Sequence, residues 1–168
     1  MAKLLQRAMP FFTTGMKIYI ATDHAGYDMK EVIASYVEKD LGYTVADMGA
    51  HQNDPNDDYP DFMQLAAQEV SHDPTGSRGI ILGGSGEGEA VVANRFPNVR
   101  CAVFYGGSLD VVKLSREHNN TNILSLGARF LSIDDAKAAV KLWLETPFSE
   151  EERHLRRLKK IEKIWPYR

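Results

Sequence analysis

Strand-like and helix-like segments alternate along most of this chain, and that alternation limits the folds open to it. Five short runs rich in β-branched and apolar residues are separated by segments in which apolar residues recur every three or four positions. The predicted strands are residues 17–22, 43–48, 79–82, 100–105 and 122–126. Such alternation is typical of a parallel sheet covered by helices on both faces. We therefore predict an α/β fold, a three-layer α/β/α sandwich with a five-stranded parallel sheet, Rossmann-like in layout.

The segments between the predicted strands carry the helices. Pro60 suits the first turn of one helix, and residues 49–58 before it, rich in Asn, Asp and Pro, indicate a loop. Further helices are predicted after the first strand, from Glu89 onward, and over residues 109–117, 134–145 and 149–164. Ligands of such sheets bind beyond the carboxyl ends of the strands, so the loops there are candidate site segments.

Length and composition narrow the class of protein. The 168 residues suit one domain, which we expect over residues 16–168 with a C-terminal helix, after an N-terminal extension at residues 1–15. The net charge of −3 argues against a general nucleic-acid binder, and no stretch approaches the ~20 apolar residues that span a membrane. The single cysteine, Cys101, permits no intrachain disulfide, and a cytoplasmic location is the default expectation.

A glycine-rich segment after the third predicted strand carries the strongest local signal for function. It reads Gly83-Gly84-Ser85-Gly86-Glu87-Gly88-Glu89. Glycines let the backbone approach a ligand closely and aim several amides at one oxyanion, and the helix N-terminus that follows adds partial positive charge. The segment lacks the Gly-Lys-Ser/Thr ending of a P-loop. It also follows the third strand instead of the first, which argues against a dinucleotide fingerprint.

Two carboxylates in this segment change its chemistry. Glu87 and Glu89 would repel a phosphate dianion bound at the turn. An amide-rich turn with a carboxylate instead suits proton abstraction beside a carbonyl, because the amides can stabilise the enediolate that forms. The alternative is that Glu89 only complements the positive end of a helix. The residues alone leave both interpretations open.

Other candidate residues stand near predicted strand and helix ends. Asp23 and His24 follow the first strand, where a capped turn is the simpler interpretation. Arg129 follows the fifth strand, and Arg153 and Arg157 lie four apart on the last helix. These arginines could clamp a phosphate bidentately, or they could form a solvated basic face.

Metal and serine-hydrolase chemistry have little support in the sequence. The five histidines are scattered without a paired metal motif or cysteine ligands, so neither a metal nor a cofactor is predicted. His118 closes a predicted helix, whose C-terminal dipole also favours a histidine. Ser85 is not in a Gly-x-Ser-x-Gly elbow. Residue types and spacing therefore indicate an α/β enzyme or binding domain for a small anionic metabolite.

Six ordered motifs together resemble a known family. They are Thr22-Asp23-His24-Ala25-Gly26, Asp58-Tyr59-Pro60-Asp61, residues 83–89 with Ala93-Asn94-Arg95, Arg116-Glu117-His118-Asn119-Asn120, Gly127-Ala128-Arg129 and Arg153-His154-x-x-Arg157. In this order they resemble the type B ribose-5-phosphate isomerases, a family that includes the allose- and galactose-6-phosphate isomerases. The similarity spans residues 16–164.

The resemblance implies an aldose–ketose isomerase that interconverts ribose 5-phosphate and ribulose 5-phosphate through a cis-enediol. Many members have a cysteine base where this chain has Gly83, whereas a mycobacterial branch has a glutamate at the position of Glu89. Glu89 is therefore the expected base. His118 would help to open the furanose ring with Asp23 nearby, and Ser85 would move a hydroxyl proton. The implied substrate-binding residues are His24, Gly84, Gly86, Gly88, Asn119, Arg129, Arg153 and Arg157.

The same resemblance implies a homodimer with active sites between its subunits, and it leaves open whether dimers pair into a tetramer. The ligand would be a small sugar phosphate. The segment 104–110 is slightly longer than in the family, so a hexose-6-phosphate substrate (allose or galactose) stays open. From another class, a non-catalytic sensor of phosphorylated sugars is the alternative, although a sensor needs the arginines and no base.

Overall fold

The computed structural model describes residues 15–164. The predicted N-terminal extension at residues 1–15 therefore lies, except for Gly15, outside the described residues. The strands are β1 (Lys17–Thr22), β2 (Thr44–Asp47), β3 (Ser77–Gly83), β4 (Cys101–Phe104) and β5 (Ile123–Gly127). The α-helices are α1 (Tyr27–Ser35), α2 (Tyr59–His72), α3 (Glu87–Ala93), α4 (Asp110–Asn119), α5 (Ile133–Glu145) and α6 (Glu152–Glu162). A 3₁₀ turn, η1 (His24–Gly26), precedes α1, and a π turn, η2 (Tyr36–Asp40), follows it.

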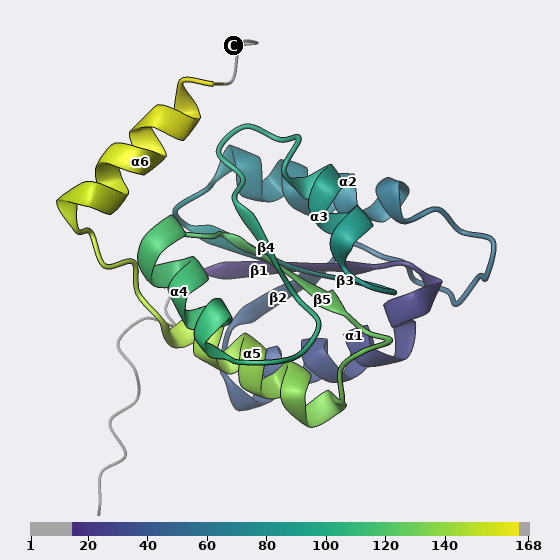
Figure 1. The fold of residues 1–168 in the computed structure, drawn as a ribbon. Helices are drawn as coiled ribbons and strands as arrows, with labels where there is room; N and C mark the ends of the chain where they lie inside the picture. The colour runs from purple at the N-terminus through teal and green to yellow at the C-terminus, as the bar shows by residue number, and fades with distance from the viewer. Residues whose placement is uncertain (1–14, 165–168) are drawn as a thin grey trace, which may run out of the picture.

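Within the described residues the strands form one five-stranded sheet in the order β2-β1-β3-β5-β4, and every pair is parallel. Helices α1, α4 and α5 cover one face of the sheet, and α2 and α3 cover the other (Figure 1). The centre of β3 shows why: Ile80 and Leu82 belong to the core on one face and Ile81 to the core on the other, all fully buried. The predicted three-layer α/β/α fold is confirmed.

The last helix is shorter than the sequence suggested. We predicted it over residues 149–164, but α6 spans Glu152–Glu162. The backbone N–H of Ser149 donates to the carbonyl of Glu117, and Glu150 has a φ of 56°, so the chain is still turning there. Figure 1 shows α6 projecting from one side of the domain, beyond the end of α4.

Candidate active site

The carboxyl ends of β1, β3 and β5 bring most of the predicted catalytic residues to one edge of the sheet. These strands are neighbours and run parallel, so the loops that follow them meet. Figure 1 shows their arrowheads pointing to the same side of the domain. We call these residues the carboxyl-edge group: Asp23, His24, Gly84, Ser85, Gly86, Gly88, Glu89 and Arg129.

Glu89 is buried at the centre of this group. Its side chain lies in the first turn of α3, which begins at Glu87, two residues earlier than predicted, and only 4% of the residue is exposed. Burial raises the pKa of the Glu89 carboxyl, as does the charge of nearby Asp23, while the amides of Glu89 and Gly86 act against the shift. A carboxylate that binds a proton more readily than usual suits a general base near neutral pH.

The absence of a side chain at Gly83 makes room for this carboxylate. A Cβ built at Gly83 would overlap the Glu89 carboxyl group. The side chain of a larger residue at position 83 would therefore occupy the space that Glu89 now fills. The position of the Glu89 carboxyl group therefore depends on a residue without a side chain at position 83.

The glycine-rich turn is held against β5. Ser125 Oγ donates to the Gly86 carbonyl at 2.6 Å, and the Ala128 amide donates to the Gly83 carbonyl at 2.8 Å. Gly86 has a φ of 82°, in the left-handed region, and a Cβ there would come within 3.1 Å of Ser125 Oγ. These contacts fix the backbone that we expect to face the substrate oxygen.

Ser85 and Arg129 lie beside the turn. Ser85 is partly exposed, and its Oγ accepts from the Glu87 amide at 3.3 Å, which leaves its hydroxyl proton for another partner. Arg129 is exposed, and its backbone amide donates to the Gly84 carbonyl at 3.1 Å. The Arg129 guanidinium lies next to Gly84, where a built Cβ would be 3.5 Å from Nη1. A cation therefore lies at the mouth of the amide-rich turn.

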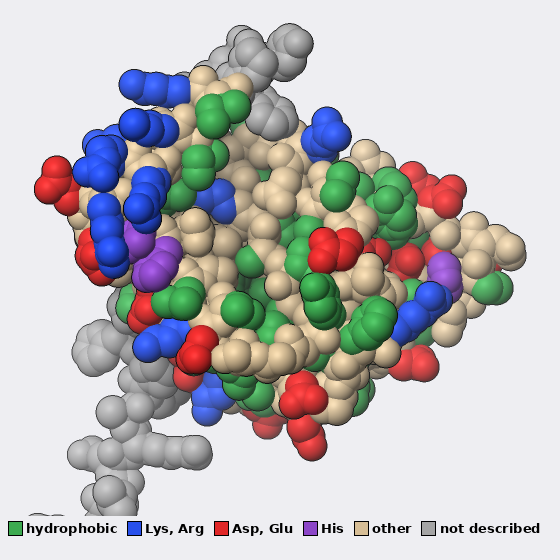
Figure 2. All heavy atoms as spheres, in the orientation of Figure 1, with side chains coloured by type: hydrophobic (Ala, Val, Ile, Leu, Met, Phe, Trp, Pro, Cys, Tyr) green, Lys and Arg blue, Asp and Glu red, His purple; other side chains and the backbone are tan. Residues whose placement is uncertain are grey.

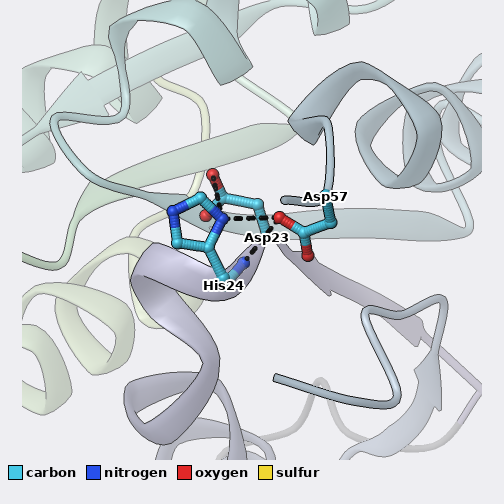
Figure 3. A group of neighbouring side chains, drawn as sticks. All are labelled: Asp23, His24 and Asp57. Atoms are coloured by element: carbon cyan, nitrogen blue, oxygen red, sulfur yellow. Dashed lines mark hydrogen bonds and ion pairs between the residues drawn. The ribbon is translucent and has the colours of Figure 1, made fainter. Parts of the chain in front are cut away.

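The structure adds Asp57, a residue that the sequence did not single out. Figure 3 shows its carboxylate pointing at the ring of His24. Asp57 Oδ1 is 2.6 Å from His24 Nδ1 and also accepts from the His24 amide at 3.2 Å. Asp23 lies near the same ring nitrogen, with its Oδ2 4.0 Å from His24 Nδ1, and its Oδ1 accepts from the Ala25 amide at 2.9 Å, as expected for a cap. The only sequence signal for Asp57 was an acidic loop in which no single aspartate stood out.

Asp23, His24 and Asp57 each offer an atom within 4.8 Å of the others, a spacing that a metal ion could use. Their contacts have an explanation without a metal, because His24 Nδ1 pairs with Asp57 and Asp23 caps the turn. The metal-free expectation stays a prediction.

The remaining predicted residues form a second group at the opposite edge of the sheet. We call it the amino-edge group: His118, Asn119, Arg153 and Arg157. His118 and Asn119 end α4, and the rings of His118 and His154 stack 4.2 Å apart at 13°. His154 is 2% exposed. Figure 2 shows Lys and Arg side chains gathered over α6, beside histidine atoms.

Within one chain the two groups do not meet. The amino-edge group lies where α4 leads into the start of β5, and the carboxyl-edge group lies where β5 ends. The five residues of β5 span roughly 16 Å at 3.3 Å per residue. The structure therefore brings Asp23, His24, Ser85, Glu89 and Arg129 together, and it leaves His118, Asn119, Arg153 and Arg157 apart from them.

The carboxyl-edge group defines a class of protein. A buried carboxylate under an amide-lined turn, with a histidine and an arginine beside it, suits an α/β enzyme that binds a small anion and moves a proton next to it. The model of the Ribose/Galactose Isomerase family matches residues 18–161. The chain belongs to this family.

Comparison with individual proteins agrees with this assignment. The chain is 42% identical over 145 residues to the ribose-5-phosphate isomerase B of Mycobacterium tuberculosis, with 86% of this chain and 87% of that protein covered. The structure resembles Mycoplasma genitalium ribose-5-phosphate isomerase B with bound ribulose 5-phosphate, with a TM-score of 0.85, 33% identity and 91% and 98% of the two chains covered. The Clostridium thermocellum enzyme has a TM-score of 0.82 and 41% identity, with 89% and 97% covered.

None of the helices in residues 15–164 has both the length and the apolar character to cross a bilayer.

Proposed function

We propose that this protein interconverts ribose 5-phosphate and ribulose 5-phosphate, with Glu89 as the base that transfers the proton. The buried Glu89 carboxylate, placed under the glycine-rich turn in the space left free at Gly83, is the observation that carries the proposal. The names of the relatives and the ribulose 5-phosphate in the Mycoplasma genitalium structure support the pentose substrate.

In the proposed reaction, one carboxylate moves a proton between two neighbouring carbons. Glu89 takes the proton from C2 of the opened aldose, and the electrons of that C–H bond form a C1–C2 double bond while the carbonyl oxygen on C1 gains a proton. The resulting cis-enediol then loses the proton of its C2 hydroxyl, a carbonyl forms at C2, and Glu89 returns its proton to C1. Amides of the turn would stabilise the negative oxygen, and Ser85 would move the hydroxyl proton.

A second copy of the chain would complete the site. The amino-edge group contains the ring-opening histidine and two phosphate-binding arginines of the proposed mechanism. It lies near the amino end of β5, whereas Glu89 lies near the carboxyl ends of the strands. In the proposed homodimer, the amino-edge group of one copy faces the carboxyl-edge group of the other. Each site then contains all the residues that the proposed mechanism needs. The separation of the two groups within one chain supports this arrangement. Sugar phosphates are metabolites of the cell interior, so we expect the enzyme in the cytoplasm.

A direct assay tests the activity. Ribose 5-phosphate is added to the full-length protein with EDTA present, and ribulose 5-phosphate is measured as it forms. We expect turnover that EDTA does not reduce. Turnover only with allose or galactose 6-phosphate would show that the substrate is a hexose phosphate and not a pentose phosphate. Thermal stabilisation by these compounds without any turnover would indicate a sensor and contradict the proposal.

A further inference from the structure

Asp57 holds His24 by two contacts through one oxygen. Its Oδ1 accepts from the His24 backbone amide at 3.2 Å and lies 2.6 Å from Nδ1 of the ring. The two residues are 33 positions apart in the chain. One carboxylate therefore fixes both the backbone and the ring of a residue in the carboxyl-edge group.

The environment of Asp57 favours a charged partner. The Asp57 side chain is 9% exposed, and its second oxygen is buried with no hydrogen-bond partner in the described part of the chain. A carboxylate withdrawn from water in this way is costly unless a cation compensates it. Among the described residues His24 is the only ion-pair partner found for Asp57.

The ring of His24 is left with one free nitrogen. Because Nδ1 faces Asp57, only Nε2 can reach a ligand. The hydrogen bond to Asp57 is the main cause that raises the pKa of His24; desolvation and the charge of Arg129 oppose it, and the charge of Asp23 adds to it. Since the pKa is raised, the ring keeps its positive charge above the usual value near 6.5 and loses it as the pH rises through the raised value.

We propose that Asp57 is a positioning residue that holds His24 as an imidazolium with its Nε2–H free for a dianionic phosphate ester. The use of the site by a sugar phosphate rests on the proposed function, but the Asp57–His24 pair does not. Asp57 itself need not touch the substrate, because it acts through the histidine.

The neighbouring aspartate offers a matched control. Asp58 is exposed, and as the N-cap residue of α2 it makes no side-chain capping hydrogen bond. Asp57→Asn and Asp58→Asn remove the same charge one position apart. Only the first removes the negative charge that faces the His24 ring, and the asparagine oxygen can still accept a hydrogen bond from it.

Two measurements on full-length protein test the proposal. NMR follows the His24 ring nitrogens through a pH titration, and calorimetry measures inorganic sulfate binding between pH 5.5 and 8.5, a range in which sulfate stays dianionic. We expect His24 in the wild type and in Asp58→Asn to titrate above 6.5. In Asp57→Asn we expect a downward shift of about one unit, with sulfate affinity reduced about tenfold near pH 7.5 and less so at pH 5.5.

Several outcomes would overturn the proposal. One is a wild-type His24 that titrates at or below 6.5, a result that needs no variant to fold. A second is the same His24 pKa in Asp57→Asn and Asp58→Asn. A third is a lower His24 pKa in Asp57→Asn with sulfate affinity unchanged. This test does not measure ribose 5-phosphate turnover. A wild-type protein that gives the expected titration and sulfate data but has no isomerase activity would contradict the proposed function and would still support the role of Asp57.

Discussion

At the scale of single residues, Gly83 and Glu89 share one space. The methyl group of an alanine at position 83 would overlap the Glu89 carboxyl group, so the carboxylate would have to move. We expect Gly83→Ala to lower kcat by about 10²-fold or more, the range that a displaced general base costs. Sulfate binding and melting temperature, measured beside turnover, should change little. Wild-type kcat in this variant would show that the carboxylate position is not needed.

The sequence could predict part of this site and not the rest. Glu89 was singled out because a carboxylate in a glycine-rich turn after a strand is a recognisable local pattern, whereas Ser85 received a role only from the resemblance to the family. Asp57 was missed because it stands among similar acids, Asp54, Asp58 and Asp61, and only the fold decides which one reaches His24. The steric relation between Gly83 and Glu89 also depends on the turn, which no residue pattern specifies.

At the scale of elements, a histidine stack joins α4 and α6. The His154 ring is buried against His118, and its Nε2 has no hydrogen-bond partner in the described part of the chain. Burial lowers the pKa of His154, and the nearby charges of His118 and Arg153 lower it further, opposed by Glu151. His154 therefore binds a proton less readily in the folded chain than in the unfolded chain.

This contact should weaken in acid. A histidine with a depressed pKa contributes stability above its unfolded pKa near 6.5, and that contribution is lost as the pH falls below it. We expect the melting temperature to drop between pH 7.5 and pH 5.5. His154→Phe keeps a flat ring in the stack without a titrating nitrogen, so its melting temperature should drop less. Equal drops in the two proteins would argue against His154 as the group responsible.

The ends of elements were harder to predict than their existence. Periodicity predicted a helix after the glycine-rich turn, but α3 begins at Glu87, which puts Glu89 within its first turn instead of at its start. The last helix begins late because the chain first crosses to α4, where the Ser149 amide meets Glu117. The spacing of apolar residues along the sequence does not predict such tertiary hydrogen bonds.

At the scale of the whole molecule, the alternation of strands and helices predicted the three layers correctly. It did not give the strand order, because several orders suit the same alternation. The order β2-β1-β3-β5-β4 decides that β1, β3 and β5 are neighbours, and hence that Asp23, Ser85 and Arg129 meet. The amino-edge group lies instead where α4 leads into the amino end of β5.

Mixed dimers test whether one site uses two chains. Glu89→Gln and His118→Asn should each be nearly inactive alone. If a site takes Glu89 from one chain and His118 from the other, a mixed dimer has one intact site, so exchange of equal amounts should restore about a quarter of wild-type activity. No recovery after exchange, with mixed dimers confirmed by mass spectrometry, would place both residues in a site within one chain.

The central claim is that Glu89 transfers the proton, and the most direct measurement compares Glu89→Gln with Glu87→Gln. Both variants remove one carboxylate from the same turn, but Glu87 is exposed and Glu89 is buried. We expect Glu89→Gln to lower kcat for ribose 5-phosphate by about 10²–10⁴-fold with sulfate binding and folding intact, and Glu87→Gln to stay within a few-fold of wild type. Near-normal turnover by Glu89→Gln, or an equal loss in both variants, would contradict the account.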